Sequence, residues 1–399
     1  MNLRSDLPFW LIRNGLTAVY PGLERDSSCD ALVVGGGISG ALLANELSSR
    51  GIDTILVDRR HAAFGSTSAS TGLLQYEIDT PLEKLKRVVG TPHAERAYLL
   101  GVEAIDRLEK VAGKDSGFAR RPSLMLARNQ AQTAGLLREF KARAEAGLRV
   151  EWLDSSDLKS EYGISRPGAI RSADAAEVDP YRLTHRLLLR AKAKGARIYD
   201  RAELKRYSQE KRGVRAYSAT GFQIRARRVF FATGYETQEF LPKDIVQISS
   251  TYAFVSEPVH DMSWWKNRTL LWESGAGYLY ARTTDEMRIL VGGVDDDMQD
   301  AELRDARVEA KTRTLVRDFR KLVPGAVDFE VAFSWAGAFG HTKDGLAYIG
   351  VYDKFPGGYF ALGYGGNGIT FSQMACRILA DLFEGKKNAD AAVFAFDRS

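Results

Sequence analysis

Near its start the chain carries the stretch Ala31-Leu32-Val33-Val34-Gly35-Gly36-Gly37-Ile38-Ser39-Gly40. The first four residues form an apolar run that is typical of a buried strand, and the spaced glycines after it allow a tight turn into a helix. A helical stretch over residues 41–50 ends at Gly51, and a second apolar strand covers residues 54–58. This strand–helix–strand unit of about thirty residues predicts a parallel sheet with helices packed on it.

The spacing of these glycines also predicts a chemical role for the turn. Gly35 permits the turn itself, Gly37 lets a pyrophosphate approach the backbone, and Gly40 lets the helix pack closely on the strand. The N–H groups and the positive dipole end at the start of the helix attract phosphate. Asp58 lies 18 positions after Gly40, where a carboxylate can accept hydrogen bonds from a ribose diol. A glycine pattern alone often marks only a tight turn, but the strand, helix and acid together predict a dinucleotide site.

A second glycine-rich segment, Gly363-Tyr364-Gly365-Gly366-Asn367-Gly368-Ile369-Thr370, opens a helix near the end of the chain. The start of this helix supplies another group of N–H donors for an anion. A reduced flavin carries negative charge around N1 and the C2 carbonyl, which such donors stabilise, whereas a reduced nicotinamide ring carries none. The alternative is a glycine turn that serves packing only. The two segments together favour flavin adenine dinucleotide (FAD) as the ligand.

The composition excludes several classes of protein. With 399 residues, of which 45% are hydrophobic and 27% charged, the chain can bury a large core and is too apolar to be disordered. Its net charge of +5 is spread along the chain, so no nucleic-acid partner is expected. Two cysteines, Cys29 and Cys376, and five scattered histidines suggest neither a disulfide framework nor a metal site. Because no signal peptide or membrane-spanning run is found, we expect a cytoplasmic protein without stable membrane insertion.

Five motifs that follow one another along the chain give it a specific resemblance. They are residues 30–40, the Ser/Thr-rich run Gly65-Ser66-Thr67-Ser68-Ala69-Ser70-Thr71-Gly72, Val178-Asp179-Pro180, Ala232-Thr233-Gly234 and residues 362–370. In this order they resemble the glycine/D-amino-acid oxidase-like family of FAD-dependent oxidoreductases, which includes the sarcosine oxidases. The resemblance covers residues 30–383 and does not single out one member.

The resemblance implies where FAD would bind. In the family the Ser/Thr-rich run lies along the pyrophosphate and the isoalloxazine ring, although taken alone the run could be a solvated loop. Leu204 falls where a backbone group meets the adenine. The expected cofactor-binding residues are Gly35, Gly37, Ile38, Ser39, Gly40, Asp58, Arg59, Ser66, Thr67, Ser68, Thr71, Gly72, Leu204, Thr233, Gly234, Gly363, Gly365, Gly366, Asn367, Gly368, Ile369 and Thr370.

The chain departs from the family in residues 335–350, which resemble the segment beside the flavin. Some relatives have an arginine there that clamps a substrate carboxylate, whereas this chain has Ala338-Phe339-Gly340. Relatives with covalently attached flavin use a cysteine, which would fall near Gly337, or a histidine in the Ser/Thr-rich run, and this chain has neither. We therefore expect noncovalent FAD, and either a carboxylate clamp elsewhere or a substrate without a carboxylate.

Tyr280 and Arg282 are predicted to be catalytic because they lie on one face of an expected strand. Alternation also places Tyr278 on that face, where two phenols and a guanidinium would bind an anionic or amphipathic substrate. The alternative is a surface ladder in which Arg282 pairs with Asp285 or Glu286. A lysine that assists reaction with oxygen in a relative would lie near Tyr280, and its absence favours a dehydrogenase over an oxidase.

His341 is the third predicted catalytic residue. Imidazole titrates near neutrality, which makes it the best polar candidate beside the flavin ring. A lone histidine is otherwise more often a packed or surface residue.

The predicted fold class is α/β, with a discontinuous Rossmann-like FAD-binding domain and a substrate domain that has a mixed or antiparallel sheet. Helices are expected over residues 97–110, 131–146 and 183–194, and strands over 123–127 and 229–234. The expected boundaries are an N-terminal arm at 1–28, FAD-binding parts at 29–99, 166–244 and 335–399, and substrate-domain parts at 100–165 and 245–334.

The expected function is oxidation of the C–N bond of a small amine or amino acid, of the D-amino-acid, glycine or sarcosine type, by hydride transfer to flavin N5. The nearest rival is oxidation of a C–O bond in a 2-hydroxy acid or polyol phosphate, for which His341 would be the base. A third reading is a flavin-binding subunit without turnover. The expected partner is thus a small molecule, and the sequence favours no oligomeric state.

Overall fold

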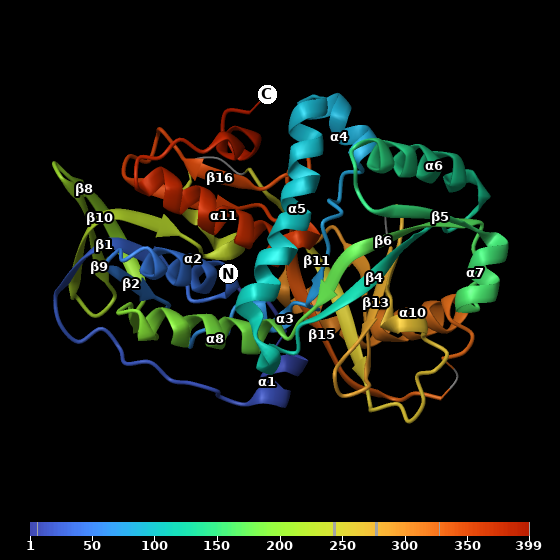
Figure 1. Ribbon diagram of the computed structural model, residues 1–399. Helices are drawn as coiled ribbons and strands as arrows, with labels where there is room; N and C mark the ends of the chain where they lie inside the picture. Colours follow the sequence, from blue (N-terminus) through green and yellow to red (C-terminus); the bar gives the residue numbers. More distant parts are fainter. Residues whose placement is uncertain (6, 242–244, 276–277, 327, 399) are drawn as a thin grey trace.

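The computed structural model describes residues 1–5, 7–241, 245–275, 278–326 and 328–398. The chain forms two sheets side by side, with helix α5 (Thr91–Ala112) between them (Figure 1). Segments from the beginning, middle and end of the chain meet in the half that contains α2 and α11, as expected of a discontinuous domain.

The first sheet is built around β1 (Ser27–Val34), the strand that precedes the glycine turn. Its strand order is β16-β17-β10-β1-β2-β7, in which every neighbouring pair is parallel except β16 with β17. The antiparallel pair β8–β9 continues from β10. The other strands are β2 (Thr54–Val57), β7 (Arg197–Tyr199), β8 (Leu204–Glu210), β9 (Gly213–Ser218), β10 (Gln223–Phe231), β16 (Tyr348–Val351) and β17 (Gly358–Leu362).

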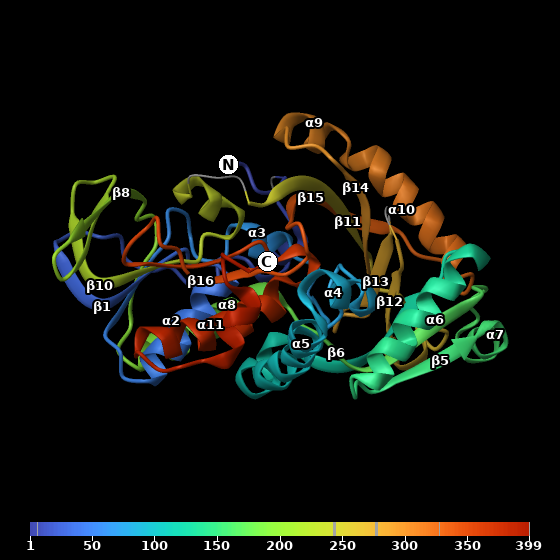
Figure 2. The ribbon, with the colours of Figure 1, turned by 90° about the horizontal axis from the view of Figure 1, so that it is seen from above.

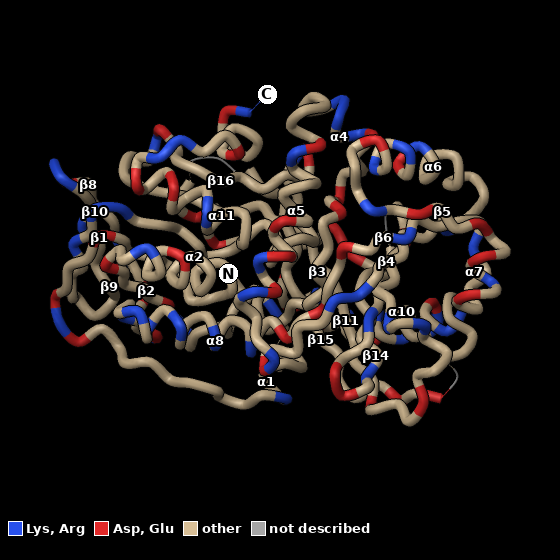
Figure 3. The backbone as a smooth tube through the Cα atoms, in the orientation of Figure 1, with Lys and Arg blue, Asp and Glu red and all other residues tan. Residues whose placement is uncertain are grey.

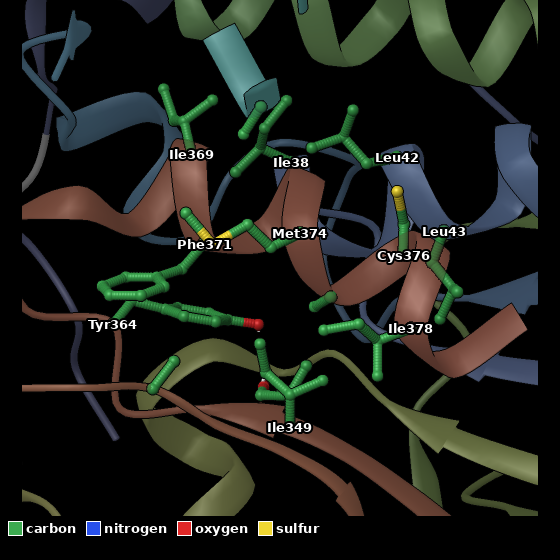
Figure 4. Packing of buried hydrophobic residues seen from close by; sticks show 14 of the residues in the cluster. Ile38, Leu42, Leu43, Ile349, Tyr364, Ile369, Phe371, Met374, Cys376 and Ile378 are labelled. Carbon is green, nitrogen blue, oxygen red and sulfur yellow. Dashed lines mark hydrogen bonds between the residues drawn. The ribbon is translucent and has the colours of Figure 1, made fainter. Parts of the chain in front are cut away.

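Three helices cover one face of this sheet: α2 (Ile38–Ser49) lies between α8 (Pro180–Ala193) and α11 (Gly368–Phe383). Figure 4 shows how Ile38 and Leu42 of α2 pack towards Met374 and Cys376 of α11. The opposite face is covered by a second apolar cluster that includes Phe231. Because both faces are covered, β1 is fully apolar from Ala31 to Val34, as parallel strands usually are.

The second sheet has the strand order β15-β11-β14-β13-β12-β4-β6-β3, with β5 also paired to β6. Most of its neighbouring strands are antiparallel, whereas β12 and β4 are parallel, so the sheet is mixed as expected. Its strands are β3 (Leu73–Leu74), β4 (Ala119–Leu126), β5 (Val150–Asp154), β6 (Gly168–Glu177), β11 (Gln247–Ser256), β12 (Leu270–Glu273), β13 (Leu279–Thr283), β14 (Ile289–Asp296) and β15 (Val331–His341).

Helix α10 (Val308–Leu322) packs across β11, β14 and β15 through the buried side chains of Leu315 and Phe319 (Figure 2). The remaining α-helices are α1 (Phe9–Asn14), α3 (Ser66–Ala69), α4 (Leu82–Val89), α6 (Gln130–Glu145), α7 (Ser155–Tyr162) and α9 (Ala301–Ala306). Short 3-10 helices cover Lys114–Ser116, Gly234–Phe240, Lys266–Arg268, Gly365–Asn367 and Ala389–Phe394.

The N-terminal arm is bound to the body at the edge of the second sheet. Leu3 accepts a hydrogen bond from the N–H of Ala338 (2.8 Å), and Ser5 donates one to the carbonyl of Ala336 (3.0 Å). Trp10 donates its indole N–H to the carbonyl of Ser70 (2.7 Å). The arm therefore covers part of the otherwise open edge of β15 and contacts the Ser/Thr-rich run.

The elements expected from the sequence are present, with longer bounds in most cases. The helix expected at 97–110 is α5, which begins at Thr91, and the strand expected at 229–234 is the end of β10. Three strands of the second sheet fall in residues that were assigned to the FAD-binding domain. They are β3 in 29–99, β6 in 166–244 and most of β15 in 335–399. These strands are short or continuous with their flanking segments, so no turn signal in the sequence marks the change of sheet.

Acidic and basic residues are interspersed over both halves of the molecule (Figure 3). Within the described ranges, no helix combines the length and the apolar character needed to cross a bilayer. The same ranges contain no group of three or more His, Cys, Asp or Glu side chains placed to hold a metal ion.

Candidate functional site

A cavity of about 890 Å³ runs along the junction between the two sheets. One end lies beside Gly35 and Asp58, at the carboxyl ends of β1 and β2, and the other is walled by β11, β13 and β15 of the second sheet. This volume is near the upper end of the range for small-molecule sites. In a sheet with parallel strands, ligands bind outside the carboxyl ends of the strands, which is where this cavity begins.

The glycine turn after β1 has no room for side chains. Gly35 has a φ of +108°, and a Cβ there would overlap the carbonyl oxygen of Ala232. A Cβ on Gly40 would overlap the carbonyl oxygen of Gly35, which confirms that α2 packs closely on the turn. Helix α2 begins at Ile38, whose N–H is bonded to the Thr67 hydroxyl, and Gly37, Ile38 and Ser39 line the cavity. The N–H groups that remain at this helix N-terminus are suited to an anion.

Asp58 follows β2 and lines the cavity beside this turn. Its two carboxylate oxygens accept hydrogen bonds from the backbone N–H groups of Gly36 (2.6 Å) and Arg60 (2.7 Å). Burial raises the pKa of Asp58 to about 6, although both N–H groups oppose this shift. The side chains of Arg59 and Arg60 both pair with Glu236, which closes this end of the cavity.

The Ser/Thr-rich run forms the short helix α3 and the turn after it. The hydroxyl of Thr67 accepts a hydrogen bond from the N–H of Ile38 (2.9 Å), which holds the run against the start of α2. The hydroxyl of Ser66 is buried beside the cavity without a partner in the part of the chain that the structure describes. Ser68 donates to the carbonyl of Gly65 (2.9 Å), so its hydroxyl serves the turn itself.

The second glycine-rich segment closes the cavity from the start of α11. It is held by an extended segment that follows the Ser/Thr-rich run. Asp79 accepts a hydrogen bond from the N–H of Gly366 (3.0 Å), and Asn367 donates to the carbonyl of Glu77 (2.7 Å). A Cβ on Gly365 would overlap the carboxylate of Asp79, so the backbone can approach this closely only as glycine.

Residues 30–382 match the family model described as FAD-dependent oxidoreductase. The chain belongs to this family. It is thus an FAD-dependent oxidoreductase, as the order of its motifs predicts.

Two curated relatives span nearly the whole chain. Glycine oxidase of Geobacillus kaustophilus is 25% identical over 384 residues, which cover 92% of this chain and 97% of the relative. Gamma-glutamylputrescine oxidoreductase of Escherichia coli is 24% identical over 387 residues, which cover 92% and 86%.

Solved structures confirm the fold. The glycine oxidase from Geobacillus kaustophilus superposes with a TM-score of 0.78 at 23% identity and covers 94% of this chain and 99% of its own. L-proline dehydrogenase from P. horikoshii gives a TM-score of 0.76 at 18% identity, with coverage of 93% and 97%.

The residues around the cavity fit the FAD of this family. The backbone cradle at Gly35 and Gly37 and the unpartnered hydroxyl of Ser66 are suited to a pyrophosphate. The carboxylate of Asp58 is suited to a ribose diol. The expected cofactor residues that line the cavity are Gly35, Gly37, Ile38, Ser39, Asp58, Arg59, Ser66, Thr67, Thr71, Leu204, Thr233, Gly234, Gly365, Gly366, Asn367, Gly368 and Ile369.

The other expected cofactor residues lie behind the lining. Gly40, Ser68, Gly72, Gly363 and Thr370 are not among the described residues that line the cavity. Gly72 and Gly363 still contribute, because a Cβ at either position would press on the backbone of Val178 or the side chain of Thr342. Their role is to let neighbouring segments approach each other.

Arg282 lies outside the cavity, which differs from both expectations for this residue. Its side chain is only 2% exposed and donates to the carbonyl oxygens of Thr71 (2.6 Å) and Val178 (2.9 Å). The expected partners Asp285 and Glu286 pair instead with Arg13. Strand alternation correctly placed Arg282 on the same face of β13 as Tyr280. At Arg282, however, the Ser/Thr-rich run lies between that face and the cavity. Arg282 therefore supports the run from behind.

Tyr278, Tyr280 and His341 all line the cavity, on the wall formed by the second sheet. The two tyrosine rings lie 5.8 Å apart, and burial raises the pKa of Tyr280 to about 12. Both phenols therefore stay protonated near neutrality and can donate hydrogen bonds, since burial also raises the pKa of Tyr278. The ring of Phe339 lies 4.5 Å from that of His341, which adds aromatic surface to this wall.

Sequence reasoning missed the polar residues Gln75, Glu77 and Asp79, which all line the cavity. Desolvation raises the pKa of Asp79, although the residue as a whole is exposed, and the Gly366 N–H and His341 partly oppose this shift. Burial also raises the pKa of Asp295 of β14. The available signal was the alternation of polar and apolar residues over 75–79, directly after the Ser/Thr-rich run.

Proposed function

We propose that this enzyme oxidises the C–N bond of a small amine or amino acid. The supporting observation is the cavity wall made of Tyr278, Tyr280, Phe339 and His341, which offers hydrogen-bond donors and aromatic surface. Oxidation of a neutral amine needs orientation more than a strong base. The names of the relatives, glycine oxidase and gamma-glutamylputrescine oxidoreductase, support the same chemistry.

In this reaction a hydride leaves the carbon next to nitrogen, the nitrogen lone pair forms the C=N bond, and an N–H proton passes to water. Bound FAD supplies the two-electron acceptor for that hydride. The phenols of Tyr278 and Tyr280 would orient the substrate, and Phe339 would exclude water from one side. Water then hydrolyses the imine to a carbonyl compound and an amine or ammonia.

The direct test is anaerobic mixing of the purified holoenzyme with amines, amino acids and 2-hydroxy acids. Loss of the flavin absorbance with an amine or amino acid supports the proposal. Bleaching by 2-hydroxy acids alone contradicts it, and bleaching by none of these compounds supports a subunit without turnover.

Oxidation of a C–O bond is the second candidate, because His341 lines the cavity and could remove a hydroxyl proton. Replacement of His341 by Asn separates the two reactions. We expect an amine-oxidising enzyme to retain flavin reduction within about tenfold, whereas loss of a general base costs roughly 100- to 10,000-fold.

A further inference from the structure

One end of the cavity is lined by an extended row of polar side chains from Gln75, Glu77 and Asp79. Glu77 is only 3% exposed; its Oε1 accepts a hydrogen bond from Ser123 (2.7 Å), and its Oε2 is buried without a partner among the described residues. Asp79 accepts one hydrogen bond, from the N–H of Gly366. Two carboxylates with unused acceptor capacity thus face the same part of the cavity.

A third carboxylate belongs to β14 and lies behind Thr251, outside the described residues that line the cavity. Asp295 of β14 is close enough to Asp79 and His341 for their charges to interact, and its Oδ1 is buried without a partner in the described part of the chain. Its neighbour Thr251 lines the cavity. Unpaired buried acceptors are costly, so their presence beside a ligand cavity indicates a donor that arrives with the ligand.

The positive groups around the cavity neutralise these acids only in part; Lys311 acts on Asp295, for example, but pairs with Asp296 (2.5 Å). Arg59 and Arg60 lie at the nucleotide end and pair with Glu236. Arg143 lies 3.7 Å from Glu77, but its main partner is Glu139 at 2.6 Å. This leaves the Gly366 N–H as the hydrogen-bond donor to Asp79.

Arg138 and Lys84, which also line the cavity, belong to the helices α6 and α4. Arg138 pairs with Glu83 (3.5 Å). A substrate carboxylate placed beside Asp79 would meet repulsion, whereas Lys84 and Arg138 could attract one placed elsewhere in the cavity.

The acids are also unsuited to the reacting nitrogen itself. A carboxylate beside that nitrogen would stabilise its ammonium form, whereas hydride loss requires the neutral amine. The carboxylates suit a second, non-reacting cation at the far end of the substrate.

We propose that the substrate is a diamine or polyamine whose distal ammonium group is bound by Asp79 with support from Glu77 and Asp295. This inference rests on the proposed oxidation of a C–N bond. It identifies Asp79 as a specificity-determining residue at the end of the cavity beyond Tyr278 and His341.

The test uses three amines of equal chain length that differ only at the far end: 1,4-diaminobutane, n-butylamine and 4-aminobutanoate. Their ends are an ammonium, a methyl and a carboxylate group. Anaerobic stopped-flow absorbance of the holoenzyme gives the rate of flavin reduction at low amine concentration. We expect the diamine to be faster than either analogue by roughly 10- to 100-fold, the value of a hydrogen-bonded charge pair.

The Asp79→Asn variant should lower the rate with the diamine by about 10- to 100-fold more than the rate with n-butylamine, so the ratio of the two rates reports the loss of the charge pair separately from any effect on the Gly366 turn. Asp295→Asn should act in the same direction with a smaller effect. The matched control is Asp297→Asn, an exposed carboxylate two residues further along, which should change neither rate. The FAD content of each variant shows whether it has folded.

Two results would overturn the inference while leaving the proposed function in place: faster reduction by 4-aminobutanoate or n-butylamine than by the diamine, or an equal loss with all three amines in Asp79→Asn. If no amine reduces the flavin while a 2-hydroxy acid does, the proposed function fails and the inference fails with it.

Discussion

At the scale of single residues, Asp58 shows how the fold prepares a polar group for its ligand. Its carboxylate is held by two backbone N–H groups and is nevertheless buried enough to raise its pKa to about 6. Because this pKa is above that of an unfolded aspartate, the stabilisation from the protonated form is complete below about pH 4 and is lost as the pH rises through 6. Near neutrality the buried charge is a cost that a hydroxyl donor can offset.

We therefore expect Asp58→Asn to weaken FAD binding by about 10- to 100-fold at pH 7.5. Binding to the parent protein should strengthen as the pH rises through about 6, because the carboxylate is the better acceptor, and the variant should lack this dependence. Titration of the apoprotein followed by flavin fluorescence measures both effects. Asp53→Asn, at an exposed carboxylate paired with Arg197, is the control and should bind FAD normally.

A second prediction at the scale of single residues concerns the pH dependence of stability that His185 causes. The side chain is 1% exposed, neither ring nitrogen has a partner among the described residues, and burial lowers its pKa to about 4 against the weaker pull of Asp200. Because the pKa is depressed in the folded state, stability is complete above about pH 6.5 and falls as the pH is lowered towards 4. The loss across this window is on the order of 3 kcal/mol.

Replacement of His185 by Phe should remove this part of the pH dependence. Thermal unfolding midpoints measured between pH 4 and 8 test it, with the exposed His93→Phe as the control. A variant that keeps the full slope between pH 4 and 6.5 would assign the pH dependence to other groups.

At the scale of elements, the N-terminus of helix α4 is held by Glu139 of α6. The Glu139 carboxylate accepts hydrogen bonds from the first N–H groups of α4, those of Leu82 (3.0 Å) and Glu83 (2.9 Å). It also pairs with the fully buried Arg143 (2.6 Å). The Glu139 carboxylate thus caps the N-terminus of α4 and also neutralises Arg143 of its own helix, α6.

We expect Glu139→Gln to lower the free energy of unfolding by roughly 3–5 kcal/mol, because Arg143 is left largely uncompensated. Chemical denaturation of the holoenzyme measures the change. Glu145→Gln, at an exposed position on the same helix, should cost less than about 0.5 kcal/mol. Equal effects of the two substitutions would show that the buried pair contributes little.

Elements also show how far sequence reasoning reached. The strand–turn–helix at Gly35 was predictable because each glycine satisfies a steric demand that no other residue meets. Alternation predicted the strand face on which Arg282 lies but not whether its side chain reaches the cavity, because that depends on which loop covers the strand. The row over residues 75–79 alternates, but it follows the two-residue strand β3 and lies outside a regular strand, so the alternation alone did not show that its polar side faces a cavity.

At the scale of the whole molecule, FAD binding depends on surfaces from both halves. No cysteine is among the described residues that line the cavity, so we predict that FAD is held without a covalent bond. Acid precipitation of the purified protein should leave the yellow colour in the supernatant. Colour that stays in the pellet would contradict the prediction and point to attachment through another side chain.

The N-terminal arm is hydrogen-bonded to Ala336 and Ala338, so the first and last parts of the chain to be synthesised pack against each other. A chain emerging from the ribosome exposes the glycine turn first, yet the wall that faces it is completed more than three hundred residues later. Nascent chains therefore have no finished flavin pocket, and products of premature termination before α11 should be colourless.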